Sequence, residues 1–138
     1  GDPETQPIML RLQSDLVELC QNAVDGKLDQ TQIQFDSRAA VGVVLAAGGY
    51  PDTYAKGKVI SGLEQAATLP GKVFHAGTEL KDGQVLTNGG RVLCATALGD
   101  TVTAAQQAAY KLAAAINWEQ LYYRTDIGYR AVAREQQQ

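Results

Sequence analysis

One segment, TNGGRVLCATALGDT at 87–101, constrains the fold of this chain more than any other. Its first part, Asn-Gly-Gly at 88–90, tolerates positive φ and predicts a tight turn. The apolar run 92–98 is rich in β-forming residues and predicts a buried strand. Gly99 breaks that strand, and the Asp-Thr pair at 100–101 is suited to cap a helix.

Arg91 is the only charged residue between Asp82 and Asp100. It lies where the turn enters the strand, beside Gly89 and Gly90, whose bare backbone lets a ligand approach. A guanidinium and backbone N–H groups that converge at such a turn suit an anionic ligand. The alternative is an ordinary hairpin turn with a solvated arginine.

Length and charge narrow the class of protein. With 138 residues the chain is one domain, or one small domain with a piece of another attached. Net charge is −3 and no Lys/Arg cluster exists, so nothing favours nucleic acid or an anionic membrane as partner. No apolar run approaches the roughly 20 residues that a membrane span requires.

The two cysteines and the single histidine argue against a metal site. Cys20 lies in a helical pattern and Cys94 in a strand pattern, and both are expected to be small buried apolar residues rather than a disulfide. One His and two distant Cys do not match zinc-site spacing. We therefore expect no zinc site, and the cytoplasm is the default compartment.

A first helix is predicted from a cap at 14–15 (Ser-Asp) to about Asp25, where Gly26 ends it. Its apolar residues follow helical spacing, so one face should pack on a neighbour. Residues 25–37 are polar and are interpreted as a connection. A domain boundary is expected near Asp36.

The remainder alternates strand and turn patterns. Residues 39–47 predict a strand buried on both faces, followed by a glycine-rich turn that contains Tyr50. This turn matches neither the phosphate-binding P-loop nor the dinucleotide fingerprint. Residues 54–70 are interpreted as loop with a short strand or turn at 59–60. Further expected elements are a strand over 72–80 interrupted at Gly77, a hairpin turn at 81–83 with a returning strand at 84–87, and one long helix with an apolar face from Val102 to Ile116.

This pattern predicts an α+β fold in which small antiparallel β-sheets pack against one long helix. Residues 118–133 give no clear element. Gln136 to Gln138 are expected to fray.

Five motifs together resemble the signature of the glycinamide ribonucleotide synthetase (phosphoribosylamine–glycine ligase) family. They follow the family's order along essentially the whole chain, which makes the resemblance specific. In this sequence they are GDPETQ (1–6), GGYP (48–51), VFHAGT (73–78), NGGRVL (88–93) and RTDIGYRA (124–131).

The resemblance implies an ATP-grasp enzyme of which this chain is a C-terminal fragment. Residues 1–36 would be the tail of the ATP-grasp domain, including its last helix, and residues 37–138 the C-terminal domain. That domain resembles the one in biotin carboxylase, a barrel-sandwich hybrid with a helix. Family enzymes use ATP with Mg²⁺ or Mn²⁺ to activate the carboxylate of glycine as an acyl phosphate. The amine of 5-phosphoribosylamine then attacks, giving glycinamide ribonucleotide, ADP and phosphate in purine biosynthesis.

The same resemblance places the family's metal-binding Glu and Asn just before Gly1, and the ATP-binding lobes outside this chain. We therefore expect the fragment to be inactive alone and to bind neither ATP nor metal. It is expected to pack, as a monomer, on the missing ATP-grasp domain.

Asp2 and Glu4 follow those metal ligands directly in the family pattern, which implies that they border the reacting carboxylate as catalytic residues. A carboxylate there would orient the ammonium of glycine or accept a proton from the attacking amine. From the residues alone, acidic decoration of a helix N-terminus is an equal alternative.

Gly89, Gly90 and Arg91 would clamp the phosphate of the substrate, with Tyr50 lining the pocket. His75 is better explained as a strand residue satisfied by a hydrogen bond. Asp126 and Arg130 are expected to form a structural ion pair. The competing interpretation of the whole chain is a non-catalytic phosphosugar-binding module or a structural interaction domain, which would expose a large apolar patch.

Overall fold

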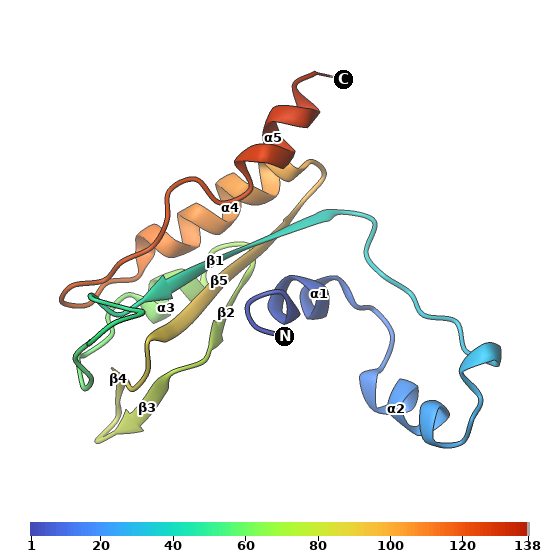
Figure 1. Ribbon diagram of the computed structural model, residues 1–138, viewed down its shortest axis with the longest axis horizontal. Helices are drawn as coiled ribbons and strands as arrows, with labels where there is room; N and C mark the ends of the chain where they lie inside the picture. Colours follow the sequence, from blue (N-terminus) through green and yellow to red (C-terminus); the bar gives the residue numbers. More distant parts are fainter. Residues whose placement is uncertain (138) are drawn as a thin grey trace.

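The computed structural model describes residues 1–137, so the expectation for Gln138 lies outside the described residues. Figure 1 shows a small sheet with a long helix along it, one short N-terminal helix close to the sheet and a second one that extends away from it. None of the described helices is long and apolar enough to cross a membrane. In chain order the elements are α1 (Thr5–Arg11), α2 (Leu16–Val24), the 3-10 helix η1 (Leu28–Gln30), β1 (Ala39–Ala46), α3 (Leu63–Ala67), β2 (Lys72–His75), β3 (Thr78–Lys81), β4 (Gln84–Thr87), β5 (Arg91–Gly99), α4 (Val102–Ala115) and α5 (Tyr129–Glu135).

The segment that most constrains the sequence also supplies the central strand. β5 pairs antiparallel with β1 on one side and with β2 on the other. β3 and β4 form a separate two-stranded antiparallel hairpin. The expected α+β architecture, small antiparallel sheets with one long helix, is confirmed.

The core lies between the sheet and α4. Val43 and Leu45 of β1, Leu93 of β5 and Leu112 of α4 are fully buried and belong to one apolar cluster. Complete burial of a side chain of this size stabilises a fold by about 1.5–3 kcal/mol.

The other face of β1 is only half-buried, because its residues alternate along the strand. α1 covers part of this second face, since a Cβ placed on Gly42 would lie 3.1 Å from Cγ of Pro7. The expectation of a strand buried on both faces was therefore wrong for β1: one face meets the core and the other is open in part to solvent.

Both predicted helix starts are confirmed by their caps. The Asp15 carboxylate accepts hydrogen bonds from the backbone N–H of Val17 at 2.7 Å and of Glu18 at 3.2 Å. The Thr101 hydroxyl accepts one from the N–H of Ala104 at 3.0 Å. Each cap satisfies a donor that the first helical turn leaves open.

Three short helices were not predicted. α1 lies before the first predicted helix, α3 lies within the segment interpreted as loop, and α5 lies in the C-terminal stretch. α3 and α5 each follow a glycine with positive φ, Gly62 at 84° and Gly128 at 81°. Helices this short depend on tertiary contacts rather than on their own propensity, so local patterns identify them poorly.

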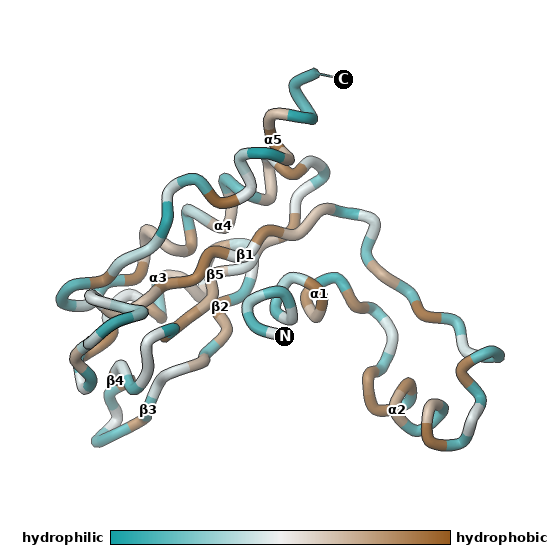
Figure 2. Tube along the Cα trace, in the orientation of Figure 1, coloured by the Kyte–Doolittle hydropathy of each residue, from teal (hydrophilic) through white to brown (hydrophobic). Residues whose placement is uncertain are grey.

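The two cysteines differ in environment. Both are free, and Cys94 is buried as expected, but Cys20 is exposed. The reason is that α2 buries none of its residues. Figure 2 shows that α2 nevertheless carries a run of hydrophobic positions. Leu16, Val17 and Val24 remain 48%, 66% and 88% exposed.

Candidate functional site

Arg91, Asp2 and Tyr50 meet at one place, although they come from three distant parts of the chain. Arg91 begins β5 and its Nε donates to Oδ2 of Asp2 at 2.8 Å. Its Nη1 donates to Oη of Tyr50 at 2.6 Å. The guanidinium also lies 5.9 Å from the centroid of the Tyr50 ring, within range of a cation–π attraction.

The two glycines before Arg91 allow close packing rather than positive φ. A Cβ on Gly90 would lie 2.1 Å from Cδ2 of Tyr50, so the tyrosine ring rests directly on the glycine backbone. A Cβ on Gly89 would lie 2.9 Å from Cα of Gly77. Neither glycine has φ in the left-handed region, so that expectation was wrong. Gly90 makes room for Tyr50, which in turn holds Arg91.

Asp2 is held through both of its oxygens. Oδ1 accepts a hydrogen bond from Nε2 of Gln6 at 3.0 Å, and Oδ2 accepts the one from Arg91. The hydrogen bond from Gln6 and then that from Arg91 lower the pKa of Asp2, while Asp2 raises the pKa of Arg91. Asp2 is thus ionised at neutral pH and is a weak base, which suits it to orient a cation better than to remove a proton.

Glu4 does not join this cluster by any hydrogen bond within residues 1–137. It sits at the N-cap position of α1, yet its side chain caps no helical N–H group. The two acidic residues of the GDPETQ motif therefore differ: Asp2 contacts Arg91, and Glu4 is exposed.

A cavity of about 370 Å³ lies beside Arg91 and Tyr50. It is mostly apolar and runs between the half-buried face of β1 and the segment that follows Trp118. Its lining residues are Pro3, Gly42, Val44, Ala46, Tyr50, Arg91, Tyr122, Tyr123, Arg124 and Ile127. A concave apolar pocket with a few convergent polar groups is the usual form of a small-ligand site.

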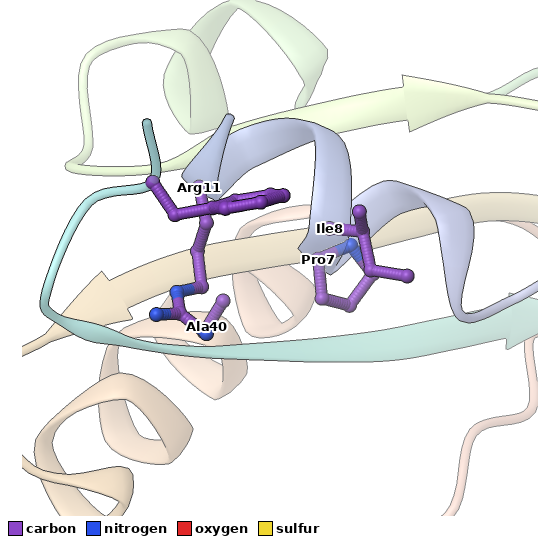
Figure 3. Close-up of a pocket in the computed structure, with 5 residues that line it drawn as sticks. Pro7, Ile8, Arg11 and Ala40 are labelled. Carbon is purple, nitrogen blue, oxygen red and sulfur yellow. The ribbon is translucent and has the colours of Figure 1, made fainter. Parts of the chain in front are cut away.

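A second cavity, of about 420 Å³, lies under α1 and contains none of the predicted site residues. Figure 3 shows Pro7, Ile8 and Arg11 of α1 beside Ala40 of β1. The guanidinium of Arg11 donates to the carbonyl oxygen of Asp36 from Nε at 3.1 Å and Nη2 at 2.9 Å. Arg11 thus fastens the connection after η1 to α1.

The remaining sequence candidates have structural contacts. Nδ1 of His75 lies 3.0 Å from the Thr78 hydroxyl, as expected for a satisfied strand histidine. Asp126 pairs with Arg124 at 2.7 Å and not with Arg130, so the expected ion pair was wrong. Arg130 instead donates from Nε to Oη of its neighbour Tyr129 at 3.0 Å.

Gln6 and Arg124 were not singled out from the sequence. A signal for Gln6 was available, because it lies four residues after Asp2 at the start of a helix, where side chains of such pairs meet. Arg124 lines the cavity because of the path that the chain takes after α4, and no local pattern in the sequence indicates that path.

Comparison with known proteins identifies the family. Residues 40–130 match the family model for the phosphoribosylglycinamide synthetase C domain. The chain belongs to this family. Tyr50, Gly89, Gly90 and Arg91 fall within the matched part of this C domain, whereas Asp2 and Glu4 precede it.

Relatives and a solved structure agree with this C-domain assignment. The chain is 68% identical over 136 residues to a phosphoribosylamine–glycine ligase of Vibrio cholerae, covering 99% of this chain and 32% of the relative. It is 66% identical over 135 residues to one of Pseudomonas aeruginosa, covering 98% and 32%. The crystal structure of the Thermotoga maritima phosphoribosylamine–glycine ligase matches with a TM-score of 0.68 and 41% identity, covering 92% of this chain and 31% of that one. The chain thus spans about a third of the length of these relatives.

Proposed function

We propose that the complete protein is a phosphoribosylamine–glycine ligase. It would join glycine to 5-phosphoribosylamine, convert ATP to ADP and phosphate, and release glycinamide ribonucleotide for purine biosynthesis. The observation that carries the proposal is the 66–68% identity to ligases of that name over nearly the whole of this chain.

Within this reaction, Arg91 is assigned to the phosphate of phosphoribosylamine. It lines the cavity, its Nε and Nη1 are fixed by Asp2 and Tyr50, and no hydrogen bond of Nη2 is found within residues 1–137. A guanidinium offers five N–H donors in a planar fork, so it can hold a carboxylate and a phosphate at once. Because Arg91 is already oriented, it loses little side-chain entropy when the substrate binds.

Asp2 is assigned to the ammonium group of glycine or to the amine of phosphoribosylamine. Its lowered pKa keeps it anionic, and it lies beside the cavity through its contact with Arg91. Glu4, two residues later and exposed, is the remaining acidic group of the motif and is retained as a second candidate. Gly89 and Gly90 shape the turn that presents Arg91.

ATP and the metal ion are assigned to the part of the protein outside this chain. Among residues 1–137, no three His, Cys, Asp or Glu side chains lie close enough to hold a metal ion. The residues present therefore do not fit a Mg²⁺ or Mn²⁺ site, and no catalytic step is assigned to a metal here. An ATP-grasp domain in the remaining two thirds of the length would supply both.

The exposed apolar face of α2 is assigned to contact with that domain. Leu16, Val17 and Val24 are more exposed than is usual for such residues, and they lie on a helix with a regular apolar face. This contact would form within one polypeptide, so a monomer is proposed. Two free cysteines fit a reducing compartment such as the cytoplasm.

A chimera tests the proposed function. The final third of the Vibrio cholerae relative, which this chain matches, is replaced by residues 1–138, and ADP and glycinamide ribonucleotide formation are measured with glycine, phosphoribosylamine and Mg-ATP. Activity close to that of the unaltered relative is expected, and this chain alone should give none. A folded chimera without ligase activity, or turnover by this chain alone, would contradict the proposal.

A further inference from the structure

The RTDIGYRA motif near the C-terminus brings a second arginine to the cavity that Arg91 lines. Arg124 comes from the segment between α4 and α5, and both arginines are among the residues around the same volume of about 370 Å³. Both side chains are partly open to solvent, 41% for Arg91 and 62% for Arg124, so both guanidinium groups are accessible to an anion that enters this cavity.

The backbone on both sides of Arg124 is fixed. Tyr110 of α4 donates from Oη to the carbonyl oxygen of Arg124 at 2.7 Å and accepts from the N–H of Ile127 at 3.0 Å. Nε2 of Gln106 donates to the carbonyl oxygen of Ile127 at 2.6 Å. Three hydrogen bonds between α4 and residues 124–127 therefore hold this short segment in place, although it has no regular secondary structure.

The same segment is also tied to the sheet, on the side where the cavity lies. The backbone N–H of Ala46 donates to the carbonyl oxygen of Tyr122 at 2.8 Å, and the N–H of Tyr122 donates back at 3.0 Å. This pair adds the segment to the edge of β1. The cavity wall formed by Tyr122, Tyr123 and Arg124 is thus fastened both to α4 and to β1.

The side chain of Arg124 is oriented as well. Its Nε donates to Oδ1 of Asp126 at 2.8 Å and its Nη2 to Oδ2 at 2.7 Å, a bidentate pair. This pairing lowers the pKa of Asp126, which stays ionised, and leaves Nη1 without a recorded partner within residues 1–137. Arg91 is instead held by two partners, Asp2 on Nε and Tyr50 on Nη1, and no hydrogen bond of its Nη2 is found within residues 1–137. Neither Asp2 nor Asp126 lines the cavity.

The remaining lining residues indicate the chemical character of the part of the ligand that is not its anionic group. Val44, Tyr123 and Ile127 offer apolar surface, and no carboxylate belongs to the lining. A compact ring with one anionic group matches such a wall, because the ring covers apolar surface while the anion meets the guanidinium groups.

We propose that Arg124 is a second anion-binding residue of this cavity and that it holds, together with Arg91, the phosphate of a pentose phosphate. Asp126 is the positioning residue of Arg124, as Asp2 is of Arg91. The choice of a pentose phosphate as the ligand rests on the proposed function, whereas the assignment of an anion to Arg91 and Arg124 rests on the cavity that both line.

Titration of this chain with ribose 5-phosphate, followed by calorimetry and by amide chemical shifts, tests the inference. Ribose and inorganic phosphate are the matched ligands, and both should bind more weakly because each lacks one half of the contacts. The Arg124→Gln variant should bind ribose 5-phosphate about ten- to a hundred-fold more weakly, as expected for one lost charge-assisted contact. The Arg130→Gln variant is the control, because Arg130 belongs to the same motif but not to this cavity.

Asp126→Asn separates positioning from charge. It should weaken binding less than Arg124→Gln, since the arginine remains but loses its fixed orientation. Equal affinity of Arg124→Gln and the unsubstituted chain, measured on folded protein, would overturn the inference, and so would the absence of saturable binding by the unsubstituted chain. An inactive chimera combined with Arg124-dependent binding would refute the ligase assignment alone.

Discussion

Arg91 and Asp2 are separated by 89 positions in the chain and joined by a hydrogen bond of 2.8 Å. The bond ties the start of the GDPETQ motif, just before α1, to the first residue of the central strand β5. The side chains are 41% and 39% exposed, and a pair so open to solvent adds little to the stability of a fold. The role of the pair is to hold an acidic and a basic group side by side at the mouth of a cavity.

The pKa of Asp2 measures this arrangement. Two hydrogen bonds to its carboxylate hold the pKa below the ordinary value of 3.8, that from Gln6 first and that from Arg91 second. Gln6→Ala and Arg91→Ala should each raise the pKa of Asp2, and the double variant should bring it close to 3.8. Titration of the carboxyl carbon by NMR gives these values. Gln13→Ala, outside the cluster, should leave the pKa unchanged, and an Asp2 pKa that no substitution moves would disprove the contacts.

Gly90 should tolerate no larger residue while Tyr50 is present. A Cβ at 2.1 Å from the tyrosine ring forces one of the two groups to move, and overpacking of this kind costs about 1–3 kcal/mol. Gly90→Ala should therefore lower the free energy of unfolding, measured by urea denaturation. In a Tyr50→Ala background the same substitution should cost less, because the obstacle is gone. Equal costs in both backgrounds would mean that Gly90 acts through its backbone conformation instead.

Glu135 of α5 makes the stability of the start of α4 depend on pH. Its carboxylate accepts hydrogen bonds from the backbone N–H groups of Thr103 and Val102, which lower its pKa below the ordinary value of 4.5. A group with a lowered pKa stabilises the fold above its unfolded value and loses that contribution as pH falls through the folded value. Glu135→Gln should therefore reduce the melting temperature at pH 7, with a difference that shrinks below pH 4.5.

The control for this experiment is Glu79→Gln, which removes an exposed carboxylate on β3. It should change the melting temperature little at any pH. A Glu135→Gln deficit of the same size at pH 7 and at acidic pH would show that the hydrogen bonds, and not the charge, stabilise the start of α4.

The central part of the fold was predictable because its signals are local. The apolar run 92–98, bounded by glycines, became β5, and the polar pair after it supplied the Thr101 cap of α4. α2 was likewise found from Asp15 and Gly26. The short helices α1, α3 and α5 were not predicted, because each depends on what it packs against rather than on its own sequence.

The candidate site was predictable only in part. The turn before β5 singled out Arg91, the family resemblance added Asp2 and Tyr50, and the structure joins the three. Nothing local in either segment indicates the pairing of Asp2 with Arg91. The position of Arg124 beside the cavity could not be predicted from the sequence either, because it follows from the hydrogen bonds that fasten its segment to Ala46 and Tyr110.

The most direct measurement is the steady-state kinetics of Arg91→Lys and Arg91→Ala in the ligase chimera, varying each substrate in turn. A lysine retains the charge but not the planar fork that binds Asp2, Tyr50 and a phosphate together. Both variants should therefore raise the KM for phosphoribosylamine about ten- to a hundred-fold. The KM values for glycine and ATP should change little. If all three KM values stay unchanged, Arg91 is a structural turn residue and the substrate phosphate is bound elsewhere.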